Sequence, residues 1–246
     1  MRKIAVLILA AAGVSLAGSA SAADIATRPV YTKAAPPAVV WSWTGGYMGL
    51  YVGGATGASD YTNTNPFAVT APTSYKLGSS FIGGYTGGYN WQFAPNWLLG
   101  YESETGYMKM KTTGLFPPAG PAFGTNEVGN LYSTISARFG YVMDKSLLYV
   151  KGGAALARFD TGVYSGAPGV GFTNHKYVTG YVAGGGWEYY FAPMWSIKAE
   201  YEYLGFDKNF TYFGPGGLAS TSHFDGIHTG KVGLNYKWHW LQLFTR

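Results

Sequence analysis

The feature that most restricts the fold of this chain is an alternation of apolar and polar side chains with a period of two residues. Between residues 195 and 203, apolar side chains at every second position alternate with Lys198, Glu200 and Glu202. A period of two is typical of a β-strand with one apolar face, and a helix would show a period of 3.6. Each such segment has about ten residues, which is the length a tilted strand needs to cross a membrane. The other segments are 47–58, 81–92, 97–108, 131–141, 148–156, 181–191 and 229–238.

The amino terminus has the layout of a cleavable secretory signal. Arg2 and Lys3 precede an apolar run over residues 4–16, and small residues follow as far as Ala22. This run is shorter than the roughly 20 residues of a membrane-spanning helix. We therefore predict a signal peptide over 1–22, a mature chain beginning at Ala23, an Ala/Pro-rich periplasmic leader over 23–43, a barrel over 44–238 and an atypical extension over 239–246.

Composition agrees with strands in a membrane. Charged residues make up 12% of the chain and aromatic residues 17%, whereas soluble domains carry about 25% charged residues. Low charge with abundant Tyr and Trp is typical of a barrel with a lipid-facing band and aromatic girdles. The net charge of +5 is too small to indicate binding to nucleic acid, and the chain has no cysteine for disulfides or thiolate metal sites.

Connections between the segments alternate in length. Tight turns are expected at 94–96, 143–146 and 192–194, and long polar loops at 59–75, 111–127, 160–175 and 206–225. Short periplasmic turns and longer extracellular loops are the pattern of bacterial outer-membrane barrels. We predict an all-β fold, an eight-stranded antiparallel up-and-down transmembrane β-barrel.

One strand-turn-strand unit occurs twice. The stretch 93–97, followed by Glu102 and Glu104, matches the stretch 191–195, followed by Glu200 and Glu202, at an offset of 98 residues. Duplication of a four-stranded half-barrel is the simplest explanation.

The alternation turns five acidic and four basic side chains toward the interior. An eight-stranded barrel is just wide enough for its side chains to fill it, so we expect these charges to pair across the lumen. A filled lumen admits no substrate, which favours a structural role over acid–base catalysis. The charge network is predicted to comprise Glu102, Glu104, Arg138, Lys151, Glu188, Lys198, Glu200, Glu202 and Lys231.

Other candidate sites are weak. The histidines lack metal-site spacing, and we expect no metal and no cofactor. His175 and His223, in or beside outer loops, are candidate haemin ligands. Ser222, His223 and Asp225 are close enough in sequence to suggest a lipid-modifying enzyme, although nothing supplies an oxyanion hole.

Several motifs resemble those of the outer-membrane immunogenic proteins of alphaproteobacteria, small porin-like surface antigens with an OmpA-like membrane domain. They are Trp43-Thr44-Gly45-Gly46-Tyr47-Met48-Gly49, Gly88-Tyr89-Asn90-Trp91-Gln92, Gly140-Tyr141-Val142, Tyr149-Val150-Lys151-Gly152-Gly153-Ala154-Ala155, Trp195-Ser196-Ile197-Lys198-Ala199-Glu200-Tyr201 and Val232-Gly233-Leu234-Asn235-Tyr236-Lys237. The resemblance implies a surface barrel that supports envelope integrity and host contact, with haemin binding in some members and no catalytic residues. Such barrels usually end on an aromatic residue, whereas this chain continues past Trp238.

The leading interpretation is a non-enzymatic surface protein of the cell outer membrane with a filled polar lumen and long loops that make its contacts. A narrow porin-like channel and a haemin-binding surface protein are the alternatives. The expected partners are outer-membrane lipid, lipopolysaccharide and extracellular or host ligands; the sequence does not indicate an oligomeric state.

Overall fold

The computed structural model describes residues 42–58, 60–63, 73–115, 123–164, 171–213 and 219–238. The expected signal peptide, the leader up to residue 41 and the carboxyl-terminal extension lie outside this set. No helix among the described residues is long and apolar enough to cross a membrane.

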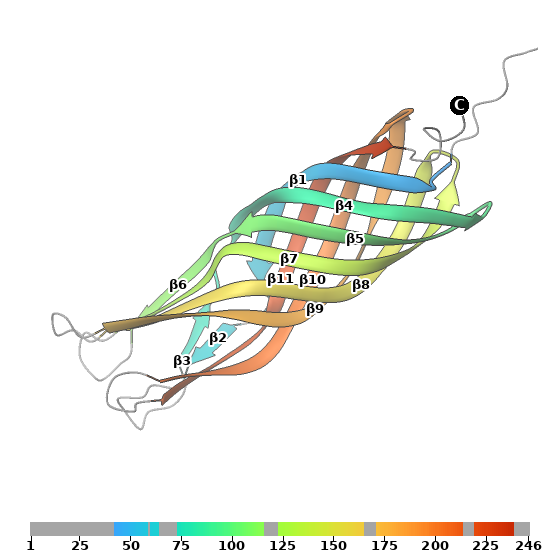
Figure 1. Ribbon diagram of the computed structural model, residues 1–246. Helices are drawn as coiled ribbons and strands as arrows, with labels where there is room; N and C mark the ends of the chain where they lie inside the picture. The colour runs from blue at the N-terminus through green and yellow to red at the C-terminus, as the bar shows by residue number, and fades with distance from the viewer. Residues whose placement is uncertain are drawn as a thin grey trace, which may run out of the picture. The chain divides into compact units, whose positions relative to one another are not determined.

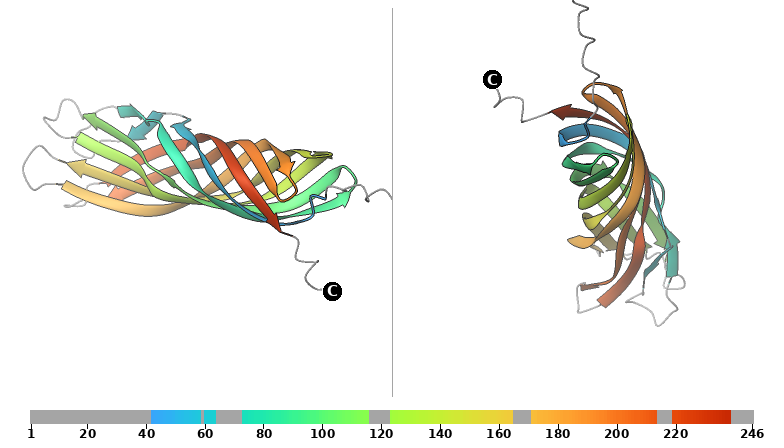
Figure 2. Two further views of the ribbon diagram at one scale, coloured as in Figure 1. Left: turned by 90° about the horizontal axis from the view of Figure 1, so that it is seen from above. Right: turned by 90° about the vertical axis from the view of Figure 1, so that its right-hand side faces the viewer.

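Eight strands close into an antiparallel barrel, which confirms the predicted fold. The ring order is β1-β4-β5-β7-β8-β9-β10-β11, and β11 pairs with β1 to complete it (Figure 1). In both views of Figure 2 the strands run at a slant around the barrel. Their bounds are β1 Gly45–Gly57, β4 Ser80–Ala94, β5 Trp97–Met108, β7 Phe123–Met143, β8 Ser146–Tyr164, β9 Gly171–Ala192, β10 Trp195–Phe213 and β11 Ala219–Trp238.

The two ends of the barrel differ. At one, here called the turn end, the tight connections 94–97, 143–146 and 192–195 join strands at the predicted places. At the other, the extension end, strands continue past the barrel, and three short strands join them (Figure 1). These are β2 Asp60–Asn63, β3 Thr73–Lys76 and β6 Met110–Leu115.

The predicted loop lengths at the extension end are wrong. β8 continues to Tyr164 and β9 resumes at Gly171, so most of the stretch expected as a loop is a paired hairpin. The β10–β11 hairpin likewise pairs as far as Phe213 and Ala219. Cross-strand hydrogen bonds satisfy backbone groups wherever a partner strand lies alongside, even where Gly, Ser and Asn suggest a loop.

Alternation sorts the side chains as predicted. Exposed large apolar residues cover the exterior of every barrel strand, and the charged side chains of the mid-strand positions are buried inside. Aromatic residues gather near the turn end, where the Trp97 ring lies 5.1 Å from the rings of both Phe139 and Tyr141. Tyr107 and Tyr177 lie toward the other end. This is an apolar band between two aromatic levels.

Tyrosine–glycine pairs explain much of the glycine inside the barrel. Tyr47 lies opposite Gly88 on the neighbouring strand, and a Cβ at Gly88 would sit 2.6 Å from the Tyr47 hydroxyl. Tyr149 and Gly186 repeat this arrangement at the same distance. These glycines leave room for a phenol ring to lie against the wall, so they are needed for close packing.

Candidate functional site

The interior is the candidate site, and it has three layers. A polar layer in the middle holds all nine predicted network residues, each buried. An apolar layer lies at the extension end, and a smaller apolar cluster lies at the turn end. Strand parity explains the order, because β10 turns Lys198, Glu200, Glu202 and Leu204 inward in succession.

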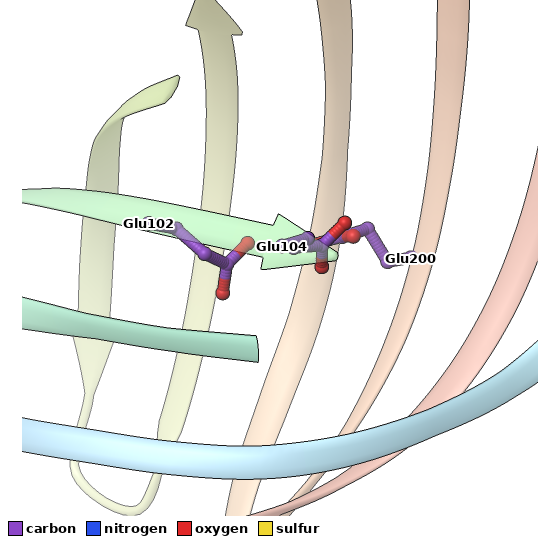
Figure 3. Close-up of side chains that lie close together, drawn as sticks. All are labelled: Glu102, Glu104 and Glu200. Atoms are coloured by element: carbon purple, nitrogen blue, oxygen red, sulfur yellow. The ribbon is translucent and has the colours of Figure 1, made fainter. Parts of the chain in front are cut away.

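The repeated Glu pairs face each other across the lumen. Glu102 and Glu104 lie on β5, and Glu200 and Glu202 lie on β10, four strands further around the ring. Carboxylate oxygens of Glu102, Glu104 and Glu200 lie within 4.8 Å of one another (Figure 3). Carboxylates this close repel one another unless cations lie between them.

Lys151 and Lys198 supply that compensation. The Lys198 Nζ lies 3.1 Å from Glu102 and 3.0 Å from Glu104. The Lys151 Nζ lies 2.7 Å from Glu102 and 3.0 Å from Glu200. The two ammonium groups therefore occupy the space between the carboxylates that a metal ion would need. Lys151 also links Glu102 on β5 to Glu200 on β10.

Lys231 closes the network next to the apolar layer. Its Nζ lies 2.9 Å from Glu200 and 2.6 Å from Glu202, and it also contacts Glu104. Removal of any one member would leave its partners as uncompensated buried charges.

Arg138 completes the network toward the turn end. Its Nη2 donates to Glu188 at 2.9 Å, and its Nη1 donates to the Tyr47 hydroxyl at 2.6 Å. The Tyr47 hydroxyl in turn donates to Glu102 at 2.9 Å. The guanidinium carbon lies 3.9 Å from the centre of the Tyr149 ring. A planar cation held by acids, a hydroxyl and an aromatic face has little freedom to move.

The apolar layer fills the extension end of the lumen. Phe159, Phe206 and Phe224 form its centre, with ring centroids 5.2 to 6.4 Å apart. The Tyr51 hydroxyl donates to the Tyr132 hydroxyl at 2.8 Å and forms the border with the polar layer. Other members are Ala55, Leu77, Ile82, Met108, Met110, Val128, Ala155, Ala157, Val178, Val182, Leu204 and Ile227.

Trp43 closes the turn end. This residue, the last of the expected leader, is fully buried, and its ring lies 4.3 Å from that of Tyr190. The indole Nε1 donates to the carbonyl of Asp144 at 3.2 Å, and the backbone amide of Trp43 donates to the Gln92 side chain at 3.0 Å. Leu98, Val142 and Leu147 pack in the same cluster.

The histidine candidates lie outside the barrel interior and are not brought together. His175 is exposed on β9. His223 on β11 has both ring nitrogens engaged, with Asn209 at 3.0 Å and Asp225 at 2.8 Å. The side chain of Ser222 lies outside the described residues, so the suggested Ser222-His223-Asp225 grouping is seen only as its His–Asp half.

Three interior features escaped the sequence analysis. Lys237 is buried near the turn end, over the Tyr190 ring, and its place in the strand alternation could have revealed it. Tyr47 and Tyr149 donate hydrogen bonds to network acids. Strand alternation places Tyr149 on the inward face with Lys151, but it does not indicate which acid either phenol meets. The apolar layer was missed because Phe206 and Phe224 fell in a stretch expected to be a loop.

Known proteins agree with this architecture. The family described as outer membrane protein beta-barrel domain matches residues 8–239. The 31 kDa outer-membrane immunogenic proteins of Brucella melitensis and Brucella suis are each 31% identical over 242 residues, covering 94% of this chain and 98% of the relative. The outer membrane protein OprG of Pseudomonas aeruginosa shares the fold, with a TM-score of 0.55 at 14% identity, covering 81% of this chain and 100% of OprG. The resemblance and the predicted location are thus confirmed: the chain belongs to the outer-membrane β-barrel protein family and lies in the outer membrane.

Proposed function

We propose that this protein is a non-enzymatic, non-conducting surface barrel, which stabilises the envelope and makes its contacts through the extension end. The observation that carries the proposal is the succession of three buried layers along the lumen. An ion crossing the barrel would have to displace Trp43 at one end, break the charge network, and pass between Phe159, Phe206 and Phe224 at the other.

The contacts of the barrel with its surroundings are proposed to be of two kinds. The exterior band contacts membrane lipid, and the paired hairpins beyond it contact lipopolysaccharide and extracellular or host ligands. Haemin binding is not part of the proposal, because the ring nitrogens of His223 are already engaged and His175 lies on a different strand.

Planar-bilayer recording of the refolded mature chain tests the proposal. We expect no steady single-channel steps, with an open porin recorded under the same conditions as the positive control. Steady steps from wild type would overturn the filled-lumen model and establish the narrow channel. To test the enzymatic alternative, lipid A from cells with wild type and with Ser222→Ala should give the same mass spectrum; a wild-type-specific change in acylation would contradict the non-enzymatic role.

A further inference from the structure

Charged side chains gather on one part of the exterior at the extension end. They lie on β6, β7, β8 and β9, which are neighbours in the sheet, and at the β5–β6 junction (Figure 1). The exterior of β10 and β11 carries Tyr201 and Tyr203, whose rings pack on His228, and, nearer the extension end, the pair His223–Asp225. The charged group, here called the cationic sector, comprises Lys109, Lys111, Glu127, Arg158, Asp160 and His175.

Strand alternation directs these side chains outward. Lys109 lies between Met108 and Met110, both fully buried in the apolar layer. Arg158 likewise lies between buried Ala157 and Phe159. Since neighbours in a strand point to opposite faces, the two cations face the surroundings of the barrel.

The sector borders the apolar exterior band. Exposed Tyr107 lies two residues before Lys109, exposed Leu156 two residues before Arg158, and exposed Tyr177 two residues after His175. Aromatic residues mark the membrane–water interface of such barrels. The cations therefore lie at the level of lipid headgroups.

The sector has more positive than negative groups. Lys109 and Lys111 share Glu127, at 3.2 and 3.3 Å, and Arg158 pairs with Asp160 at 2.9 Å. The hydrogen bond to Glu127 raises the pKa of the Lys109 ammonium group. The side chain of Lys111 is 62% exposed and that of Lys109 35%, so both can reach a second acceptor.

We propose that the cationic sector binds phosphate groups of the outer-leaflet glycolipid, with Lys109, Lys111 and Arg158 donating to the phosphate oxygens. The acyl chains of the same lipid would lie on the apolar band beside Tyr107 and Leu156. Ammonium and guanidinium groups form strong charge-assisted hydrogen bonds with phosphate, and Glu127 and Asp160 hold the cations in place. This inference rests on the proposed function for the orientation of the extension end toward the cell surface.

Lipid binding by the full mature chain in detergent micelles tests the proposal. Native mass spectrometry would measure binding of bisphosphorylated lipid A and of the same lipid without phosphates. We expect the phosphorylated lipid to bind about tenfold more tightly, and the double variant Lys109→Gln/Lys111→Gln to lose that preference. Lys145→Gln, which removes one positive charge at the turn end, should behave as wild type. Heat-modifiable migration in gels would verify that each variant is folded.

Equal binding of the two lipids by wild type, or an unchanged preference in the double variant, would overturn the proposal. Millimolar inorganic phosphate distinguishes the source of the phosphate: if it abolishes all lipid binding, the site is for free phosphate and the glycolipid assignment is wrong. Neither result bears on conductance, so this inference and the filled, non-conducting lumen of the proposed function can fail separately.

Discussion

The polar and apolar layers of the interior fill the same lumen in opposite ways. In the polar layer, charges from opposite walls neutralise one another, so each side chain depends on several specific partners. In the apolar layer, the rings of Phe206 and Phe224 fill space by packing, and the hydrogen bond between Tyr51 and Tyr132 lies at its border. The difference predicts that the polar layer is sensitive to the loss of any one group, whereas the apolar layer responds to the volume removed.

The largest effect is expected from Glu200→Ala. Glu200 contacts Lys151 and Lys231 at 3.0 and 2.9 Å and accepts a hydrogen bond from Tyr149 at 2.6 Å. Its loss leaves buried cations uncompensated, and the free energy of unfolding should fall by about 3 to 5 kcal/mol in urea titrations. Glu127→Ala is the matched control, an acid that also has two lysine partners but lies on the exterior; about 0 to 1 kcal/mol is expected there. Equal midpoints for the two variants would contradict the filled-lumen model.

The next largest effect should follow Ile197→Arg. Ile197 is exposed on the apolar band, whereas its neighbour Lys198 is buried inside among acids. A guanidinium in the apolar band should cost about 2 to 4 kcal/mol at the bilayer midplane and less toward the interfaces, because hydrocarbon cannot solvate it. Unfolding from lipid vesicles would measure this cost, and Asn130→Arg, at an exposed position of β7, should be nearly silent. Similar costs at both positions would mean that the band is misplaced.

A smaller effect is expected for Ile82→Val in the apolar layer. Ile82 is fully buried, and loss of one methylene group should destabilise the barrel by about 1 kcal/mol. The same urea titration measures it. If Ile82→Val lowered the free energy of unfolding as much as Glu200→Ala, the two layers would be equally sensitive to substitution, and the contrast between them would be wrong.

The smallest net effect is expected when Glu202 and Lys231 are both replaced by Met. They contact each other at 2.6 Å, and the next inward positions on their strands toward the extension end, Leu204 and Thr229, lead into the apolar layer. Replacing both partners leaves fewer uncompensated charges than replacing one, so the double variant should be more stable than either Glu202→Met or Lys231→Met. Additive losses in this double-mutant cycle would show that the two residues act independently.

The sequence predicted the polar layer better than anything else in the interior. A period of two determines the face of every residue once one register is known, so Glu102 and Glu200 could be placed inside without a structure. Which cation meets which acid could not be predicted, because those contacts depend on the slant of the strands around the ring. The lengths of the hairpins at the extension end also depend on partner strands. Because residues 206–225 were expected to form a loop, Phe206 was not placed in the interior. Trp43 contacts Gln92 of β4, Asp144 of the β7–β8 turn and Tyr190 of β9, and no local pattern reveals these contacts.

Cross-lumen pairing also has a consequence for the order of events in folding. Lys231 and Glu104 are 127 residues apart in the chain, and Lys198 and Glu102 are 96 apart, so these contacts close very long loops. Loop-closure entropy delays such contacts until the ring is nearly complete, and until then the charges are hydrated. The network should therefore form after the rate-limiting step, contributing little to the speed of insertion and much to the slowness of unfolding. The strands of such a barrel can therefore still change their pairing while they assemble, and the barrel unfolds slowly once it has closed.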